Sequence, residues 1–251
     1  MTVPTFAARK KAWSSPPVDD VGYVPSADLL AMDDQDFLYV IEEAVANRYE
    51  GWRNHRGAWT KYLTRWDTTA GQRILDYGCG IGLESLILAK KNQVILADIS
   101  EGNLAVAERA IILNGHEHHG LHLISEHAPF IEPAPAELDI ILCLGVLHHI
   151  PKPVPVVEAM GGWLKQGGEL RLMLYSDEAW RIAVGKEPPV DPVEEDPGFE
   201  MFWKYWDPIG GYADWYDYYK LDRLFGEWFR VKSCKPLTEH GEYVAAVLVA
   251  R

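Results

Sequence analysis

Short apolar runs alternate with segments of helical period from residue 73 onward. The apolar runs lie at 73–76, 93–97, 121–124, 138–143 and 168–175, and the helical segments at 83–91, 102–113 and 153–164. Such alternation predicts βαβ units, and hence a parallel sheet covered by helices on both faces. Gly167 and Gly168 are expected to end the last of these helices before the fifth strand begins.

The residues before this alternation predict an N-terminal addition. Residues 1–27 are rich in Pro, Ser and Asp and predict an irregular arm. Helical spacing begins near Asp33 and continues through a second stretch that ends near Trp66. We therefore assign residues 1–70 to an arm and a helical cap, and residues 71–251 to an α/β domain.

The residues after Tyr175 break the alternation. A Pro- and acid-rich stretch, 185–198, precedes an aromatic-rich one, 199–229, and we assign about 177–228 to an insert. The two final apolar runs predict an antiparallel hairpin at the edge of the sheet, 229–235 and 242–250. Together these patterns predict a doubly wound, mostly parallel sheet of seven strands, with the hairpin as its last two.

The charge and the cysteine content narrow the class of protein. The formal net charge is −13, which argues against a nucleic-acid partner because such proteins usually present a basic face. Cys79, Cys143 and Cys234 are far apart and predict neither a disulfide framework nor a zinc ribbon. The first residues lack the apolar segment of a signal peptide, and no apolar run reaches membrane-spanning length. We expect a soluble cytoplasmic protein with no membrane partner.

A glycine-rich turn follows the first predicted strand. That strand ends at Asp76, and Gly78, Gly80 and Gly82 follow at alternate positions. Glycines there let the backbone turn with positive φ and approach a ligand closely. The second strand ends in Asp98, an acid that can accept both hydroxyls of a ribose, although an acid in this place can also cap a helix. The pattern predicts a site for a nucleotide-like ligand at the carboxyl ends of the strands.

Two classes of ligand fit a glycine turn of this kind. A nicotinamide dinucleotide site uses the spacing G-x-G-x-x-G, which places a pyrophosphate on a helix N-terminus. Here the spacing is G-x-G-x-G, and Asp76 stands two residues before the first glycine. A carboxylate in that place repels a pyrophosphate but suits a ligand that carries an ammonium group. The dinucleotide is therefore the weaker hypothesis.

Between residues 73 and 175, and again in the C-terminal hairpin, the chain resembles the class I S-adenosylmethionine-dependent methyltransferases, which have a Rossmann-like fold. The resemblance rests on the loop 76–82, Asp98, the run 138–150 and the turn 163–170. It implies S-adenosylmethionine as the methyl donor and S-adenosylhomocysteine as the product. The segment 125–130 stands where the family frames the adenine, with Glu126 in place of the family's common Asp. The cofactor-binding residues that the resemblance implies are Asp76, Gly78, Cys79, Gly80, Gly82, Asp98, Ile99, Glu126, His127, Ala128 and Cys143.

Two histidines stand where such proteins often face their substrate. His148 and His149 directly follow the fourth predicted strand. Either could act as a catalytic base toward a hydroxyl or an amine, because His titrates near neutrality. The alternative is that they only pack or cap a turn, and His149 is the stronger catalytic candidate. The histidine-rich segment 115–122 lacks a matching set of Cys or acids, so we expect a solvated loop there and no metal.

The aromatic insert carries the remaining clue to the acceptor. Its Tyr and Trp residues predict either a lid that lines a pocket for an aromatic or cationic ligand, or packing of the insert onto the sheet. Three interleaved acids would suit a basic substrate or face water: Asp207, Asp214 and Asp217. The helical cap would close the other side of the pocket with Tyr49, Trp52, His55 and Trp59.

The sequence as a whole predicts methylation of a small molecule at oxygen or nitrogen. The fourth strand lacks the Asn/Asp-Pro-Pro-aromatic box typical of enzymes that methylate exocyclic amines of DNA bases. Together with the acidic charge, this disfavours a nucleic-acid substrate. Three alternatives stay open: a non-catalytic regulator that binds S-adenosylmethionine, a methyltransferase of a macromolecular substrate, and the less favoured nicotinamide oxidoreductase.

Overall fold

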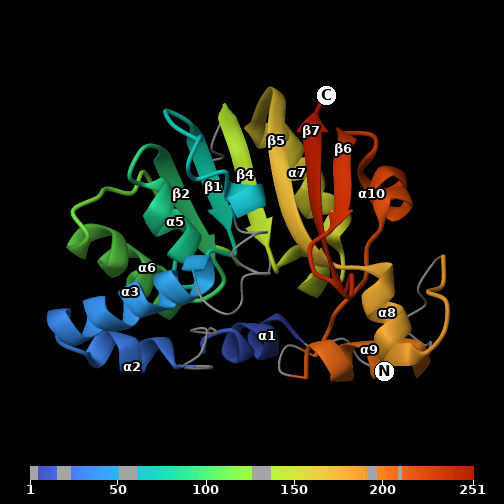
Figure 1. The fold of residues 1–251 in the computed structure, drawn as a ribbon, viewed down its shortest axis with the longest axis horizontal. Coiled ribbons are helices and arrows are strands. Elements are labelled where there is room, and N and C mark those ends of the chain that lie inside the picture. Colours follow the sequence, from blue (N-terminus) through green and yellow to red (C-terminus); the bar gives the residue numbers. More distant parts are fainter. Residues whose placement is uncertain (1–4, 16–23, 51–60, 126–136, 191–196, 209–210) are drawn as a thin grey trace.

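A seven-stranded sheet forms the centre of the molecule in the computed structural model (Figure 1). The structure describes residues 5–15, 24–50, 61–125, 137–190, 197–208 and 211–251. The strands are β1 (Arg73–Tyr77), β2 (Gln93–Asp98), β3 (Leu121–Leu123), β4 (Leu138–Leu144), β5 (Leu164–Tyr175), β6 (Phe229–Pro236) and β7 (Tyr243–Ala250). Their order is β3-β2-β1-β4-β5-β7-β6. Neighbours pair in parallel except at β7, which runs antiparallel to both β5 and β6.

Helices cover both faces of the sheet. On one face, α3 (Asp34–Glu50), α5 (Leu83–Leu88) and α6 (Glu101–Leu113) share a hydrophobic core with β1, β2 and β4. On the other face, α7 (Pro153–Trp163) and α10 (Tyr218–Phe225) share a second core with β5, β6 and β7. The predicted doubly wound sheet with a C-terminal antiparallel hairpin is therefore confirmed.

Burial on both faces explains why the strands are continuous apolar runs. In β2, Val94 and Leu96 belong to one core, and Ile95 and Ala97 belong to the other. Successive side chains of a strand point to opposite faces, so a strand covered on both sides needs an apolar residue at every position.

The glycine pair near β5 has a different role from the one predicted. Helix α7 ends at Trp163 and β5 begins at Leu164, so Gly167 and Gly168 lie inside the strand. The pairing of β4 with β5 shifts register over this stretch, which makes the glycines part of an irregularity in β5. Gly167 has a φ of 79°, a left-handed conformation that glycine adopts without steric cost.

The N-terminal arm contains two short helices, contrary to the irregular arm predicted. They are α1 (Phe6–Ala12) and α2 (Ser26–Ala31). The Thr5 side chain caps α1 by accepting a hydrogen bond from the Ala8 N–H (3.3 Å). Helices of two turns or fewer repeat their apolar face too few times for the period to stand out in the sequence.

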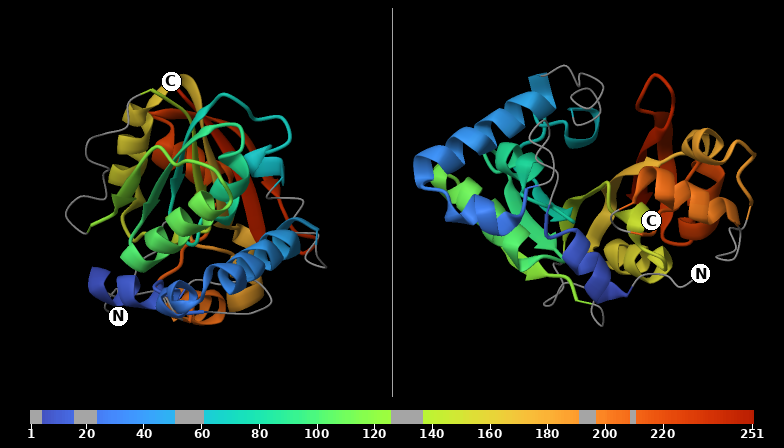
Figure 2. Two further views of the ribbon diagram at one scale, coloured as in Figure 1. Left: turned by 90° about the vertical axis from the view of Figure 1, so that its left-hand side faces the viewer. Right: turned by 90° about the horizontal axis from the view of Figure 1, so that it is seen from below.

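The insert builds a small core of its own at the carboxyl ends of the parallel strands. Helices α8 (Asp177–Val184) and α9 (Pro197–Trp206) lie at this edge of the sheet, as do α1 and α2 (Figures 1 and 2). Tyr175 at the end of β5 packs with buried aromatic residues of the insert: Trp180, Phe199, Phe202 and Trp215. Other aromatic residues stay exposed on the insert, among them Tyr205, Tyr218 and Tyr219.

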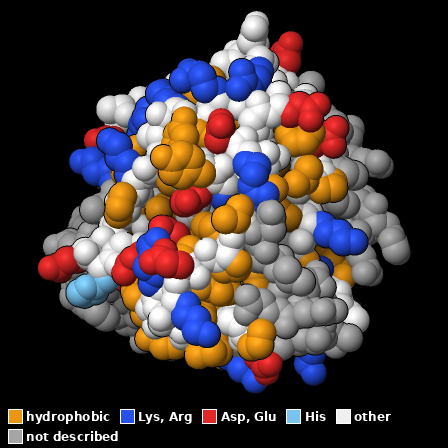
Figure 3. Space-filling view, turned by 90° about the vertical axis from the view of Figure 1, so that its right-hand side faces the viewer, with side chains coloured by type: hydrophobic (Ala, Val, Ile, Leu, Met, Phe, Trp, Pro, Cys, Tyr) orange, Lys and Arg blue, Asp and Glu red, His pale blue; other side chains and the backbone are white. Residues whose placement is uncertain are grey.

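Within the described part of the chain, no helix combines the length and the apolar character that crossing a bilayer requires. On the face formed by the C-terminal elements, basic and acidic side chains are interspersed with apolar ones (Figure 3).

Candidate active site

The carboxyl ends of β1 and β4 mark the point where the strand order reverses. From β1 the chain adds β2 and β3 on one side, then returns to place β4 on the other side of β1. In open α/β sheets a crevice for ligands forms at this switch point. The glycine-rich loop after β1, the end of β2 and the short helix η2 (Leu147–His149) after β4 all lie at this edge.

The three glycines of the loop adopt positive φ, but for different reasons. Their φ angles are 78° at Gly78, 54° at Gly80 and 76° at Gly82. A Cβ on Gly78 would lie 2.3 Å from the Val146 side chain, and one on Gly82 would lie 2.7 Å from Ala107. Among the described residues, a Cβ on Gly80 would meet no atom within 4 Å. Gly78 and Gly82 thus allow close packing, whereas the described residues leave space beside Gly80 through which a ligand can approach the backbone.

Asp98 lies beside Gly80 at the end of β2 and is 5% exposed. Its Oδ2 accepts a hydrogen bond from the Gly80 N–H (2.9 Å), and its Oδ1 accepts bonds from the Ser100 N–H (2.8 Å) and the Asn103 amide (3.1 Å). Burial raises the pKa of Asp98, and these hydrogen bonds oppose the rise. Ser100, and not Asp98, caps α6 with its side chain. The acid therefore ties the glycine loop to the start of α6.

The other described residues that are predicted to bind the cofactor differ in their burial and in their partners. Asp76 is buried and accepts a hydrogen bond from the Ser85 hydroxyl (2.6 Å). Cys79 is also buried, and burial raises the pKa of its thiol. Cys143 has no exposed surface and belongs to the core beneath the crevice, while Ile99 packs against that core partly exposed.

Part of the predicted site lies outside the described residues. This holds for the adenine segment, with Glu126, His127 and Ala128, and for three of the cap residues, Trp52, His55 and Trp59. The side chain of Tyr49 also lies outside them. Their roles stay predictions.

In the described part of the chain, no group of three or more His, Cys, Asp or Glu side chains could hold a metal ion.

The two histidines after β4 form a continuous hydrogen-bonded chain. His148 Nδ1 accepts a bond from the Tyr175 N–H (3.2 Å), and His148 Nε2 lies 2.9 Å from His149 Nε2. His149 Nδ1 lies 3.0 Å from the Tyr212 carbonyl oxygen and 3.0 Å from a carboxylate oxygen of Asp207.

The partners of this chain assign the tautomers of both rings. Because His148 Nδ1 accepts, its proton lies on Nε2 and is donated to His149 Nε2. His149 then carries its proton on Nδ1 and donates it to the Tyr212 carbonyl. All four ring nitrogens have protein partners. For His149 Nε2 to accept a proton from a substrate, its bond with His148 must open first. The pair joins β4 and β5 to the insert, and its predicted catalytic role stays a prediction.

Lowering the pH is expected to destabilise the protein through His148. Burial, and then the proximity of His149, lowers the pKa of His148 well below its usual range. The folded protein therefore keeps His148 neutral, whereas the unfolded chain binds a proton near pH ~6.5. The free energy of unfolding should fall as the pH drops below about 6.5, by up to about 1.4 kcal/mol per pH unit for this group. Urea unfolding at about pH 7.5 and about pH 5.5 measures the slope.

The variant His148→Asn isolates this effect, since Asn keeps an acceptor for the Tyr175 N–H but does not titrate. We expect the free energy of unfolding of this variant to depend less on pH than that of the wild type. The difference in slope should correspond to the uptake of up to one proton on unfolding. Burial also shifts the pKa values of His122 and Asp98, but both are present in each protein and cancel in the difference. Equal slopes would contradict a buried neutral His148.

The interleaved acids of the insert have protein partners. Asp207 and Asp214 are 3% and 6% exposed, so neither faces water. Asp214 accepts hydrogen bonds from Lys220 Nζ with both carboxylate oxygens (2.7 and 2.8 Å), and its own N–H donates to the His148 carbonyl (2.8 Å). Asp217 caps α10 by accepting from the Lys220 N–H (2.7 Å). These acids hold the insert in place beside the histidine pair.

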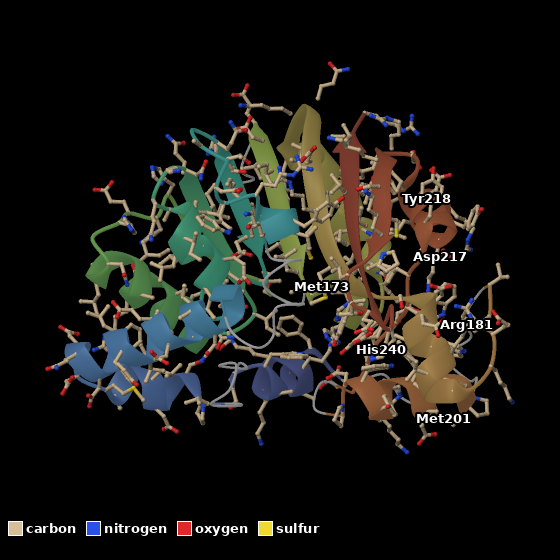
Figure 4. All side chains as sticks on the ribbon, in the orientation of Figure 1. Met173, Arg181, Met201, Asp217, Tyr218 and His240 are labelled. Carbon is tan, nitrogen blue, oxygen red and sulfur yellow. The ribbon has the colours of Figure 1, made fainter. Side chains whose placement is uncertain are left out.

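Side chains of the insert and of β5 lie differently relative to the ends of the parallel strands. Arg181, Met201 and Tyr218 lie on its outer side, whereas Met173 of β5 lies toward the carboxyl ends of the central strands (Figure 4). Met173 is close to the turn after β4, since a Cβ on Gly145 would lie 3.3 Å from its Cε atom.

The N-terminal arm contacts residues on both sides of the switch point, which no local sequence signal indicates. The Trp13 ring lies 4.9 Å from the His149 ring, centroid to centroid, and the Arg9 guanidinium donates to the His149 carbonyl (3.3 Å). The Asn103 amide donates to the Trp13 carbonyl (2.9 Å) as well as to Asp98.

The region that contains this site matches a known family model. The model described as a methyltransferase domain matches residues 75–170, which include the glycine loop, Asp98 and the histidine pair. Residues 75–170 are a methyltransferase domain. The resemblance found in the sequence is confirmed for this part of the chain.

The methyltransferase domain has curated relatives that match over a similar length. The ubiquinone biosynthesis O-methyltransferase of Stutzerimonas stutzeri (strain A1501) is 32% identical over 102 residues, which are 40% of this chain and 43% of that protein. The chain thus spans less than half the length of this relative.

Solved structures match more of the chain at lower identity. The magnesium protoporphyrin IX methyltransferase of Synechocystis PCC 6803, crystallised with bound SAM, is 14% identical with a TM-score of 0.58, and the match covers 100% of both chains. The cyclase SpnF is also 14% identical, with a TM-score of 0.59 and coverage of 86% of this chain and 94% of its own. At such identities the likeness shows the class I methyltransferase fold alone.

Proposed function

We propose that this protein transfers a methyl group from S-adenosylmethionine to an oxygen or nitrogen atom of a small-molecule acceptor. One observation carries the proposal: the buried carboxylate of Asp98 lies 2.9 Å from the Gly80 N–H of the glycine loop, at the switch point of the sheet. The methyltransferase domain that includes both residues supports the same reaction class.

The residues at the switch point suit this donor. Asp98 would accept hydrogen bonds from ribose hydroxyls, as a carboxylate with two acceptor oxygens can. The open space at Gly80 lets a ligand approach the loop backbone. Asp76 and Asp98 both place a carboxylate at this edge, which favours a ligand that carries positive charge. When bound, S-adenosylmethionine supplies an electrophilic methyl group on a sulfonium sulfur.

The chain itself would contribute position and the exclusion of water, the two factors from which an in-line transfer gains most. The arm and the insert both contact His149 at this edge of the sheet. The histidine pair holds the insert against β4 and β5. For His149 to act as a base, the His148 ring must first turn away from His149 Nε2. We therefore rank the base role second to the positioning role.

We favour a small acceptor over a polymer, because the arm and the insert both contact His149 at the edge of the sheet where the ligands would bind. The O-methyltransferase activity in the name of the curated relative is in keeping with such an acceptor. A cationic acceptor finds no support in the insert acids, since Asp214 is paired with Lys220 and Asp217 caps a helix.

Isothermal titration calorimetry with S-adenosylmethionine, S-adenosylhomocysteine and NAD⁺ tests the proposal. We expect both sulfur ligands to bind and NAD⁺ not to bind. If neither S-adenosylmethionine nor S-adenosylhomocysteine binds, the proposal is overturned. Binding without transfer of a radiolabelled methyl group to any member of a broad panel of phenols, carboxylic acids and amines would favour the non-catalytic regulator.

A further inference from the structure

The N-terminal arm crosses the edge of the sheet from the donor side to the acceptor side. Helix α1 lies below the carboxyl ends of the strands, between α2 and α9 (Figures 1 and 2). The hydrogen bonds that join the arm to His149 and Asn103 link residues more than 75 positions apart in sequence, so only the tertiary structure brings them together. They fall into two groups, one at each side of the crevice.

Asn103 is the centre of the contacts on the donor side. It is 2% exposed, and its amide nitrogen donates to Asp98 Oδ1 (3.1 Å) and to the Trp13 carbonyl (2.9 Å). Its amide oxygen lies 2.5 Å from the Ser26 hydroxyl, and the Ser26 N–H donates to the Ser14 carbonyl (3.2 Å). One buried side chain thus joins the acid of the donor site to both described parts of the arm. All its hydrogen-bonding groups are used.

The contacts on the acceptor side converge on His149. The Trp13 ring packs against the His149 ring, and Arg9 donates to the His149 carbonyl. The other side of His149 is held by Asp207 and Tyr212 of the insert. The arm and the insert therefore meet on the same residue.

We propose that the arm is a strap that closes the donor site, and that Asn103 is a positioning residue that couples docking of the strap to Asp98. The inference rests on the proposed function. Because one docked segment contacts both sides of the crevice, the donor and its product exchange only when the strap releases. Docking in turn completes the hydrogen bonds of Asn103 and so holds Asp98 in place for the ligand.

Trypsin digestion measures how often the strap undocks, because trypsin cleaves after Arg9, Lys10 and Lys11, and all three belong to α1. In the wild type we expect S-adenosylhomocysteine to slow cleavage at these bonds about tenfold, since cleavage requires the helix to undock. The same samples give the rate at which bound radiolabelled S-adenosylhomocysteine exchanges with excess unlabelled ligand.

Trp13→Ala removes the ring contact with His149 and is the main test. We expect this variant to lose the protection from trypsin and to release S-adenosylhomocysteine about tenfold faster, with an unchanged melting temperature. Tyr39→Ala is the matched control, because Tyr39 is an exposed aromatic residue on α3 (65% exposed). The control should behave like the wild type in both measurements.

Asn103→Ala tests the coupling. Asn103→Ala alone should increase the release rate as Trp13→Ala does. The double variant with both substitutions should release the ligand little faster than either single variant, because both substitutions act on one docked state. Equal release rates and equal trypsin protection in Trp13→Ala and Tyr39→Ala would overturn the strap while leaving the proposed function intact. A wild type that does not bind S-adenosylhomocysteine would overturn both.

Discussion

Asp98→Ala is expected to weaken the binding of S-adenosylhomocysteine by about 100-fold or more, which corresponds to about 2.7 kcal/mol. The side chain accepts bonds from Gly80, Ser100 and Asn103, so its loss leaves buried donors of the glycine loop and of α6 without their acceptor. A hydrogen bond to a charged group is worth about 1.5–3 kcal/mol, and the variant also loses the proposed acceptor for the ribose. Isothermal titration calorimetry measures the change.

Asp139→Ala is the matched control for this variant. Asp139 is also an aspartate of a central strand, but it lies near the amino end of β4, where it accepts bonds from the Arg73 N–H and from Lys165. It should bind S-adenosylhomocysteine as the wild type does. His149→Ala should lower turnover more than it weakens ligand binding. If Asp98→Ala and His149→Ala both leave activity intact, the site is assigned wrongly.

Lys220→Met is expected to lower the free energy of unfolding by about 3–5 kcal/mol, because it leaves a buried carboxylate without its cation. Lys220 is 3% exposed; its Nζ bonds both oxygens of Asp214 and lies 4.3 Å from the centre of the Trp215 ring. Burial raises the pKa of Asp214 and lowers that of Lys220, and their mutual attraction opposes both shifts. Urea unfolding followed by tryptophan fluorescence measures the loss.

Lys204→Met provides the comparison within the same insert. Lys204 forms an ion pair with Glu200 one turn away on α9, but both side chains are largely exposed. An exposed pair of this kind contributes less than about 1 kcal/mol. A second variant, Asp214→Leu with Lys220→Met, removes both charges and should recover part of the stability. If Lys220→Met costs no more than Lys204→Met, the buried pair does not anchor the insert.

The fold could be predicted because its signals are local. The alternate sides of β2 are buried in two different cores, and this requires the continuous apolar run that the sequence shows. The two errors have local causes as well. Helices α1 and α2 are too short to show a period, and Gly167 and Gly168 serve an irregularity within β5 instead of a helix end.

The candidate site could be predicted only in part. The spacing of Gly78, Gly80 and Gly82 and the acid at the end of β2 indicate a ligand site because backbone conformation and strand position depend on nearby residues. Asn103 and Trp13 gave no such signal. Only the fold places Asn103 against Asp98 and Trp13 against His149.

By itself the sequence determined the doubly wound sheet, its glycine loop and the class of domain, since side-chain period and glycine conformation act over a few residues. Only the tertiary structure decided which polar groups share a partner. It placed the arm across the donor acid and His149, and it paired Asp207 with His149 and Asp214 with Lys220. Buried polar groups need hydrogen-bond partners, and here those partners come from segments far apart along the chain as well as from nearby residues.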